Sequence, residues 1–173
     1  MTIGQILIAQ PSRVADRAAI RTDMEATRMA YHQLLASLSD TDLQRPCAIS
    51  RWTIQELLCH MALLLGQAVP MMVKQARKGK PMPKLLDTRF GHWMNYQMAV
   101  RAARKATRAS ITQRYDAAHS NLLRLLENVG ESEWALPTAY PDGRPLTMET
   151  VFHVPTEHFE LHAAWVRQTL SDR

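Results

Sequence analysis

The stretch that decides the fold is Trp52-Thr53-Ile54-Gln55-Glu56-Leu57-Leu58-Cys59-His60-Met61-Ala62. Thr53 is a favourable helix N-cap, and Glu56 three residues later completes a capping box, in which the two residues satisfy each other's backbone N–H groups. Apolar residues then recur at helical spacing as far as Met72. The pattern therefore predicts an amphipathic helix that begins after Thr53 and that Pro70 kinks or ends.

Three further segments show the same helical periodicity. We predict a first helix over about 20–38, a long third helix over about 88–128, and a last helix over about 148–170 that Pro155 bends or divides. Pro141-Asp142-Gly143 predicts a tight turn at the tip of a small hairpin. Because amphipathic helices must bury their apolar stripes against one another, the sequence predicts an all-α, four-helix up-down bundle.

The chain length fits one domain with a short N-terminal extension. The 173 residues allow a sizeable core, and we assign the bundle to residues 20–173 and the extension to residues 1–19, with a break at Pro11-Ser12. A weak internal repeat relates 38–46 to 129–137, each followed by a turn and a threonine-capped helix. The repeat fits two αα-hairpins related by a pseudo-twofold axis, and chance similarity over so few positions would look the same.

Composition excludes several classes of protein. Hydrophobic residues make up 46% of the chain, which excludes general disorder, and the two cysteines, Cys47 and Cys59, give no disulfide framework. The N-terminal apolar run lacks a basic lead and is too short for a signal peptide. The most apolar stretch, 57–73, is interrupted by polar residues and Pro70, so we expect no membrane span, no membrane partner and a cytoplasmic location.

The net charge of +5 is unevenly distributed. Residues 74–114 contain eleven basic residues and one acid, Asp87. This basic block is typical of a solvated helix face with a basic loop; it would also suit a positive rim, in which Lys74, Arg77 or Lys78 guides an anionic substrate or an acidic partner. The block lacks a recognition motif and interleaved aromatic residues, so we do not expect nucleic acid as the partner.

Three of the seven histidines are placed to share a ligand. His158 and His162 are four residues apart and so lie on one face of the last helix, while His60 lies beside the apolar stripe of the second helix. Three imidazoles with one open position suit a catalytic zinc-type site, and nickel and iron also accept imidazole. The spacing alone leaves open a second interpretation, in which these are buried histidines that only satisfy hydrogen bonds.

The residues around the histidines identify no general base. In His158-Phe159-Glu160-Leu161-His162 the glutamate stands two residues after the first histidine, so it points away from the histidine face and this is not a zinc-protease motif. His153 is five residues before His158, a poor spacing for a shared face. The candidates for a base are Tyr31, Tyr96 and Glu56, and a structural role explains each of them more simply.

At these residues the chain resembles the DinB/YfiT-like metalloenzyme superfamily, which includes the N-terminal domain of mycothiol-dependent maleylpyruvate isomerase. The resemblance covers roughly residues 20–170. It depends on a Trp-Thr start with a histidine eight residues after the tryptophan, here Trp52 and His60, and on the pair His158 and His162. The chain departs from the family at Ala163, where many relatives have a further histidine, and at Pro155.

The resemblance implies a divalent metal, Ni, Zn or Fe, held by His60, His158 and His162. It also implies a metal-dependent enzyme of the thiol-transferase or hydrolase kind, acting on a small-molecule substrate or with a thiol cofactor, and a homodimer. A second hypothesis is a non-catalytic bundle that binds or sequesters a small hydrophobic molecule in a methionine-lined cavity. A third and weaker hypothesis is an interaction module for nucleic acid that works through the basic block.

Overall fold

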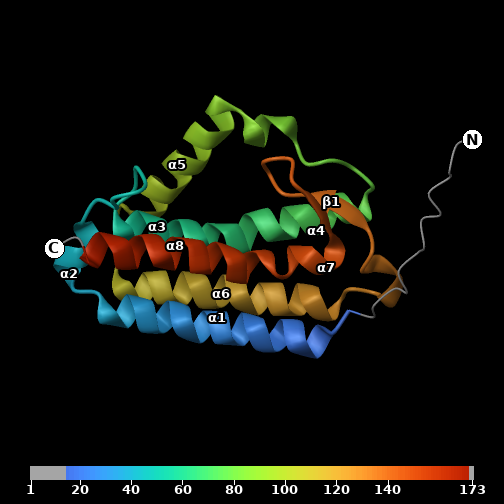
Figure 1. The fold of residues 1–173 in the computed structure, drawn as a ribbon, viewed down its shortest axis with the longest axis horizontal. Helices are drawn as coiled ribbons and strands as arrows, with labels where there is room; N and C mark the ends of the chain where they lie inside the picture. Colours follow the sequence, from blue (N-terminus) through green and yellow to red (C-terminus); the bar gives the residue numbers. More distant parts are fainter. Residues whose placement is uncertain (1–14, 172–173) are drawn as a thin grey trace, which may run out of the picture.

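Four long helical segments pack side by side around one apolar core (Figure 1). The structure, a computed structural model, describes residues 15–171, so the predicted break at Pro11-Ser12 lies outside the described residues. The bundle consists of α1 (Arg17–Ser37), the stretch formed by α3 (Ile54–Leu63), η1 (Leu64–Ala68) and α4 (Val69–Arg77), α6 (Arg108–Glu127), and α8 (Val154–Ser171). The shorter elements are α2 (Asp40–Gln44), η2 (Lys84–Asp87), α5 (Arg89–Ala103), η3 (Glu131–Glu133), β1 (Pro137–Ala139), β2 (Pro145–Thr147) and α7 (Met148–Val151). The all-α bundle predicted from the sequence is confirmed.

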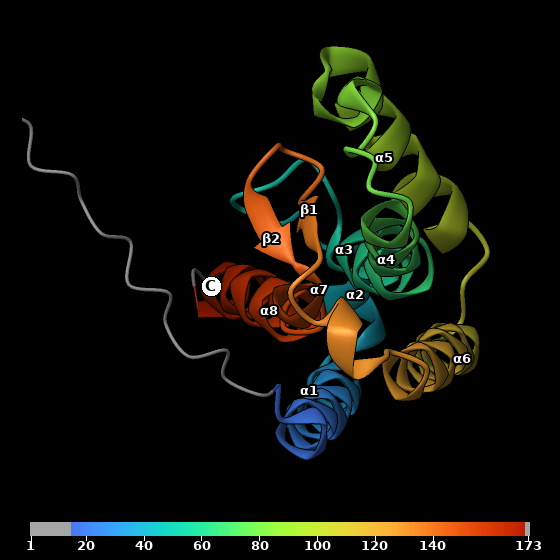
Figure 2. The same ribbon diagram turned by 90° about the vertical axis from the view of Figure 1, so that its right-hand side faces the viewer.

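The prediction of one helix over 88–128 is wrong. The chain forms α5, leaves the helical path at Arg104, and begins α6 at Arg108, where the Thr107 side chain accepts a hydrogen bond from the backbone N–H of Ser110. This stretch of sequence contains no proline, and its one glycine is Gly91. Apart from the Thr107 cap, nothing in the sequence therefore indicates that one helix ends and another begins. As a result α5 lies outside the bundle, against α3 (Figure 2).

The position of α5 shows that the predicted up-down order of the four helices is wrong. Gln55 at the start of α3 donates to the carbonyl of Ala103 just before α6 (2.8 Å), and Arg77 at the end of α4 donates to the carbonyl of Asn128 just after α6 (2.8 Å). The α3–α4 stretch and α6 therefore run in the same direction, because α5 carries the chain back along the outside. This return path is what places α5 over the side of the bundle that α3 and α4 form.

The two predicted helix disruptions are present at the prolines. Pro70 is the second residue of α4, which follows the π-helical turn of η1, and this turn accommodates the missing backbone N–H of the proline. Pro155 is the second residue of α8, a position that tolerates proline, and α7 ends before it at Val151. Both disruptions adjoin the histidines: η1 follows His60, and α8 starts one turn before His158.

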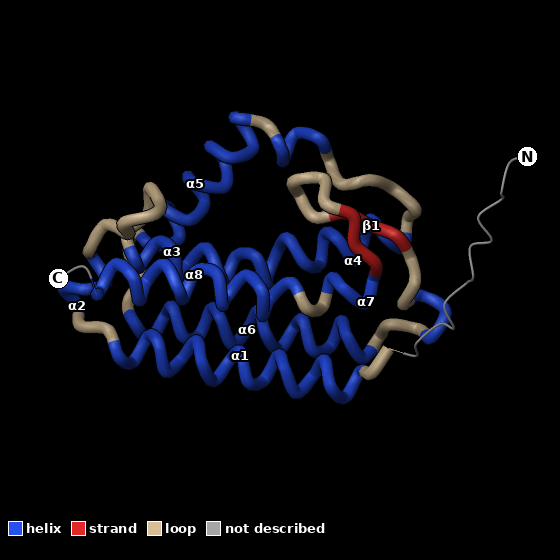
Figure 3. The backbone as a smooth tube through the Cα atoms, viewed as in Figure 1, coloured by secondary structure: helices blue, strands red, loops and turns tan. Residues whose placement is uncertain are grey.

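The weak repeat of the sequence corresponds to repeated backbone hydrogen bonds. The N–H of Ile54 donates to the carbonyl of Arg45 (3.0 Å), and the N–H of Met148 donates to that of Leu136 (2.9 Å). Equivalent antiparallel pairings stand beside these bonds, Pro46 with Thr53 and Pro137 with Thr147. The second pairing is extended into the β1–β2 hairpin, whose tip contains the predicted turn with Gly143 at φ +88° (Figure 3).

The α3–α4 stretch is also the most apolar part of the described chain. Ile54–Arg77 has the length and mean hydropathy (1.5) of a membrane-crossing helix, a test that the core helix of a soluble protein passes as well. In this fold 61% of its apolar window is buried inside the molecule, and it contacts α6 and α8. Its apolar character is accounted for by its central place in the bundle.

Candidate metal centre

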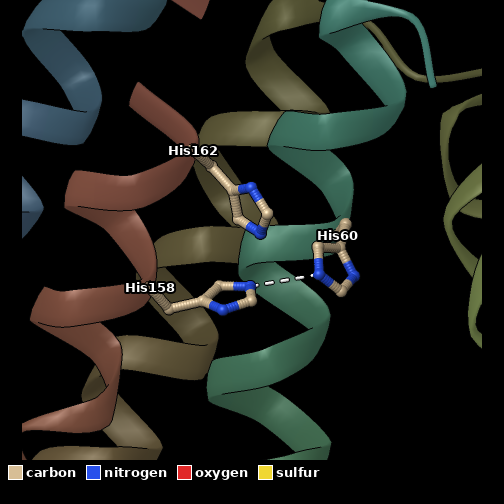
Figure 4. A group of neighbouring side chains, drawn as sticks. All are labelled: His60, His158 and His162. Carbon is tan, nitrogen blue, oxygen red and sulfur yellow. Dashed lines mark hydrogen bonds between the residues drawn. The ribbon is translucent and has the colours of Figure 1, made fainter. Parts of the chain in front are cut away.

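Three histidine side chains from two helices meet inside the bundle (Figure 4). His60 projects from α3, and His158 and His162 project from one face of α8. One ring nitrogen of each lies within 4.8 Å of those of the other two. The structure thus brings together the three residues that the sequence analysis grouped.

The rings are arranged around one point rather than stacked. Nε2 of His158 lies 3.1 Å from Nε2 of His60, within hydrogen-bond distance. The rings of His158 and His162 have centroids 4.2 Å apart and planes inclined by 88°, and those of His60 and His162 have centroids 5.3 Å apart and planes inclined by 73°. Near-perpendicular rings can direct their lone pairs at one common position from different sides.

All three imidazoles are neutral near pH 7. Burial lowers the pKa of His60 to about 3, assisted by the neighbouring His162 and opposed by a polar contact with Asn95. Burial, together with the two neighbouring histidines, lowers the pKa of His158 to about 2, and burial lowers that of His162 to about 4. A metal ion requires the neutral form of histidine, so the ligand set needs no deprotonation.

The buried nitrogens fit a metal ion. Within the described part of the chain, Nδ1 of His60 and both ring nitrogens of His162 are buried without a hydrogen-bond partner. Unpartnered buried polar atoms are costly, and a metal ion bound by one nitrogen of His162 would remove that cost at this atom. One ring nitrogen from each of the three histidines lies within 4.8 Å of the other two, which is close to the separation of roughly 3.4 Å between two donors of a tetrahedral zinc ion.

Aromatic residues enclose the three rings. Trp52 stacks on His60 with centroids 4.4 Å apart, and Trp165 meets His162 edge-on at 4.6 Å. Tyr140, at the end of the hairpin, places its hydroxyl 3.4 Å from Nδ1 of His158. Sequence reasoning did not identify Trp165 or Tyr140 as site residues, because their proximity arises only when the hairpin and α8 fold against α3.

The other described histidines have separate environments. His32 forms a 2.8 Å hydrogen bond with Asp116, and buried His119 lies 3.9 Å from a carboxylate oxygen of Glu25. His92 is exposed near Asp87, and His153 stands between α7 and α8, outside the three-histidine group. These four residues therefore add nothing to the candidate ligand set.

The candidate bases have structural roles or lie at the edge of the site. Glu56 accepts from the backbone N–H of Thr53 (2.8 Å), as the predicted capping box requires, and buried Tyr31 donates to the carbonyl of Leu58 (3.0 Å). Tyr96 of α5 stacks beyond Trp52, with ring centroids 6.3 Å apart. Burial raises the pKa of the Cys59 thiol to about 11, which keeps it protonated and inert.

A cavity of about 310 Å³ lies beside His60, between η1, α4, α5 and the hairpin tip. His60, Asn95 and Tyr140 form part of its wall. The described residues that line this cavity do not include Lys74, Arg77 or Lys78, which the sequence suggested as guides for an anionic substrate. Arg77 is instead paired with Glu133 (2.8 Å), so it does not serve as a free cation at the cavity mouth.

Comparison with known proteins gives one family. The sequence profile of the DinB superfamily matches residues 23–166. No curated protein sequence is significantly similar to the chain. The match spans all four helices of the bundle and includes the three histidines.

Several solved structures share the fold at low sequence identity. YfiT from Bacillus subtilis, described as a probable metal-dependent hydrolase with an unusual four-helix bundle topology, is 15% identical with a TM-score of 0.70, over 96% of this chain and 93% of YfiT. The mycothiol-dependent maleylpyruvate isomerase is 12% identical with a TM-score of 0.70, over 87% of this chain but only 60% of the isomerase. A protein from Clostridium difficile 630 is 11% identical with a TM-score of 0.68, over 88% of this chain and 94% of that one.

Proposed function

The chain belongs to the DinB superfamily, and from this premise we propose that it is a metal-dependent enzyme in which His60, His158 and His162 hold one divalent metal ion. The observation that carries the proposal is the convergence of three neutral imidazoles, two buried and one partly buried, beside a cavity large enough for a small molecule. The reaction class is hydrolysis or transfer to a thiol, in line with the descriptions of YfiT as a probable metal-dependent hydrolase and of the isomerase as mycothiol-dependent.

When bound with one open position, a divalent metal supplies Lewis-acid activation of a water, a thiol or a carbonyl group. The residues of this chain position the histidine rings and keep water away from them. Trp52 and Trp165 fix the planes of two histidine rings and exclude water from them. If Nε2 of His158 holds the metal, its Nδ1 would carry the proton and would donate to the hydroxyl oxygen of Tyr140, which would fix the tautomer.

Zinc, nickel and iron are all candidates for the metal. A set of three neutral nitrogen donors suits each of these ions, and the ligand types do not distinguish among them. A magnesium or calcium site would need oxygen donors, and the three clustered side chains provide only nitrogen.

A second candidate function is the binding or sequestering of a small apolar molecule. The cavity beside His60 favours it, because its wall is mainly apolar. The third hypothesis, an interaction module, has less support, because some arginines of the basic block form hydrogen bonds within the folded chain. Arg108 binds the carbonyls of Leu35 and Leu38, and Arg114 donates to the carbonyl of Ala102.

Activity measured with and without metal distinguishes a metal-dependent enzyme from a protein that only binds a small molecule. We would remove metal with a chelator, restore zinc, nickel or iron, and follow 4-nitrophenyl acetate hydrolysis and the conjugation of low-molecular-weight thiols to 1-chloro-2,4-dinitrobenzene. The proposal expects one of the two reactions to depend on metal in the wild type and to be lost in His162→Ala but kept in His32→Ala. Equal rates for metal-free and metal-loaded protein in both assays would contradict it.

A further inference from the structure

We infer that the cavity beside His60 selects an uncharged, apolar small molecule that presents a single polar atom to His60. The inference rests on the proposed function insofar as it makes this molecule the substrate of the metal centre. Binding itself depends only on the cavity, which is formed by residues outside the three-histidine group except for His60.

The cavity owes its existence to α5. Because α5 leaves the bundle and contacts α3 (Figure 1), its first half stands over η1 and α4 and forms an outer wall with Leu86 and Met82 of the preceding segment. A volume of about 310 Å³ lies at the lower end of the range of small-molecule sites. One continuous helix over 88–128, as predicted from the sequence, would have left no such enclosure.

Methionine and leucine are the most frequent residues of the wall. The methionines come from three separate elements: Met71 from α4, Met82 from the loop that follows it, and Met94 and Met98 from α5. The unbranched, polarizable methionine side chain adapts to irregular apolar shapes, so this lining suits a hydrophobic body without requiring one exact outline.

The polar atoms of the wall are few. Tyr140, which touches Nδ1 of His158, lines the cavity together with His60 and Asn95, so a ligand in the cavity also borders the histidine group. Gln67 of η1 adds one amide to this lining. A ligand with one polar atom could meet these groups while its remaining surface contacts thioethers and leucines.

The charge of the wall argues against an anionic ligand. Among the described lining residues Asp142 is the one carboxylate, none is a lysine or arginine, and the imidazoles are those of His60 and His92. Burying a carboxylate or sulfonate without a cationic partner is strongly unfavourable. The basic block therefore does not give the cavity a preference for anions, although it dominates the sequence around α5.

Two fluorescent probes that differ by one sulfonate test this selectivity. We would titrate neutral N-phenyl-1-naphthylamine and anionic 1-anilinonaphthalene-8-sulfonate into the full-length protein, both metal-free and loaded with zinc. We expect the neutral probe to bind at least about tenfold more tightly in both states. Equal affinity, or tighter binding of the sulfonate, would overturn the inference, whatever the metal analysis shows.

Three variants test whether the two probes bind in this cavity. Met98→Gln places an amide in the lining and should weaken the neutral probe about tenfold, whereas Met29→Gln on exposed Met29 of α1 should leave it unchanged. Gln67→Lys should raise affinity for the sulfonate about tenfold by supplying the missing cation. A neutral-probe affinity that Met98→Gln leaves unaltered, or an unaltered sulfonate affinity in a folded Gln67→Lys protein, would overturn the assignment to this cavity.

Discussion

The indole of Trp52 lies nearly parallel to the imidazole of His60, with ring centroids 4.4 Å apart and planes inclined by 27°. Trp52 also faces His162 edge-on at 6.5 Å. It thus contacts ligand candidates from both helices, and we regard it as a positioning residue. The tryptophan that opens the decisive stretch of sequence is therefore connected to the site by direct contact.

Replacing Trp52 should loosen the histidine geometry. We expect Trp52→Leu to weaken metal affinity about tenfold, because the ring of His60 loses the surface that fixes its plane. Competition titration against a chromogenic chelator measures this, and Trp52→Phe, which keeps an aromatic face, should recover most of the affinity. An unchanged affinity in Trp52→Leu would show that other contacts fix the ring.

Tyr31 should matter for stability and not for the metal. Its hydroxyl donates to the carbonyl of Leu58, and its ring stacks on Tyr115 with centroids 3.7 Å apart. Tyr31→Phe removes one buried hydrogen bond and should lower the free energy of unfolding by about 1 kcal/mol, measured by urea denaturation. Loss of metal-dependent activity at unchanged stability would instead restore Tyr31 as a catalytic candidate.

The stability of the bundle should fall in acid through Asp116. Burial alone would raise the pKa of Asp116, but hydrogen bonds from Arg28 and His32 outweigh it and lower that pKa. A lowered pKa means that this carboxylate stabilises the fold above its unfolded pKa, and that the contribution is lost as pH falls through the folded value.

The matched variant for this effect is Asp116→Asn. It should reduce stability at pH 7 by about 1 kcal/mol, as expected for a partly exposed ion pair, and should flatten the dependence of stability on pH below about 4. Thermal unfolding between pH 3 and 7 measures both quantities. If the stability of the variant falls as steeply in acid as that of the wild type, other carboxylates cause the loss of stability at low pH.

Gly91 should be needed for the position of α5. A Cβ at this residue would lie 2.6 Å from the carbonyl oxygen of Leu86 and still closer to that of Leu85, both of them backbone atoms. Gly91→Ala should therefore displace the start of α5, lower stability by about 1–3 kcal/mol and weaken binding of N-phenyl-1-naphthylamine. Unaltered stability and probe affinity would mean that η2 moves without affecting the cavity.

Local sequence signals account for the features that were predictable. The capping box at Thr53 and Glu56, the same-face spacing of His158 and His162, and the helix disruptions near Pro70 and Pro155 each depend on residues close together in the chain. These signals define the bundle and two of the three ligand candidates. His60 required the further assumption that α3 and α8 pack together, which their contacts bear out.

The features that were missed depend on contacts between distant segments. The break between α5 and α6 carries no proline or glycine signal, so helical periodicity continued through it. The cavity exists because of that break, and Tyr140 joins the site only because the hairpin folds against α8. The homodimer, the cytoplasmic location and the N-terminal extension over 1–19 stay predictions.

The identity of the ligands tests the central claim most directly. Elemental analysis combined with X-ray absorption on the zinc-loaded protein should find about one metal per chain with three imidazole donors. The single variants His60→Ala, His158→Ala and His162→Ala should each lose that metal, while His32→Ala should retain it. Full metal occupancy in any of the three, or a spectrum dominated by sulfur or carboxylate donors, would contradict the assignment.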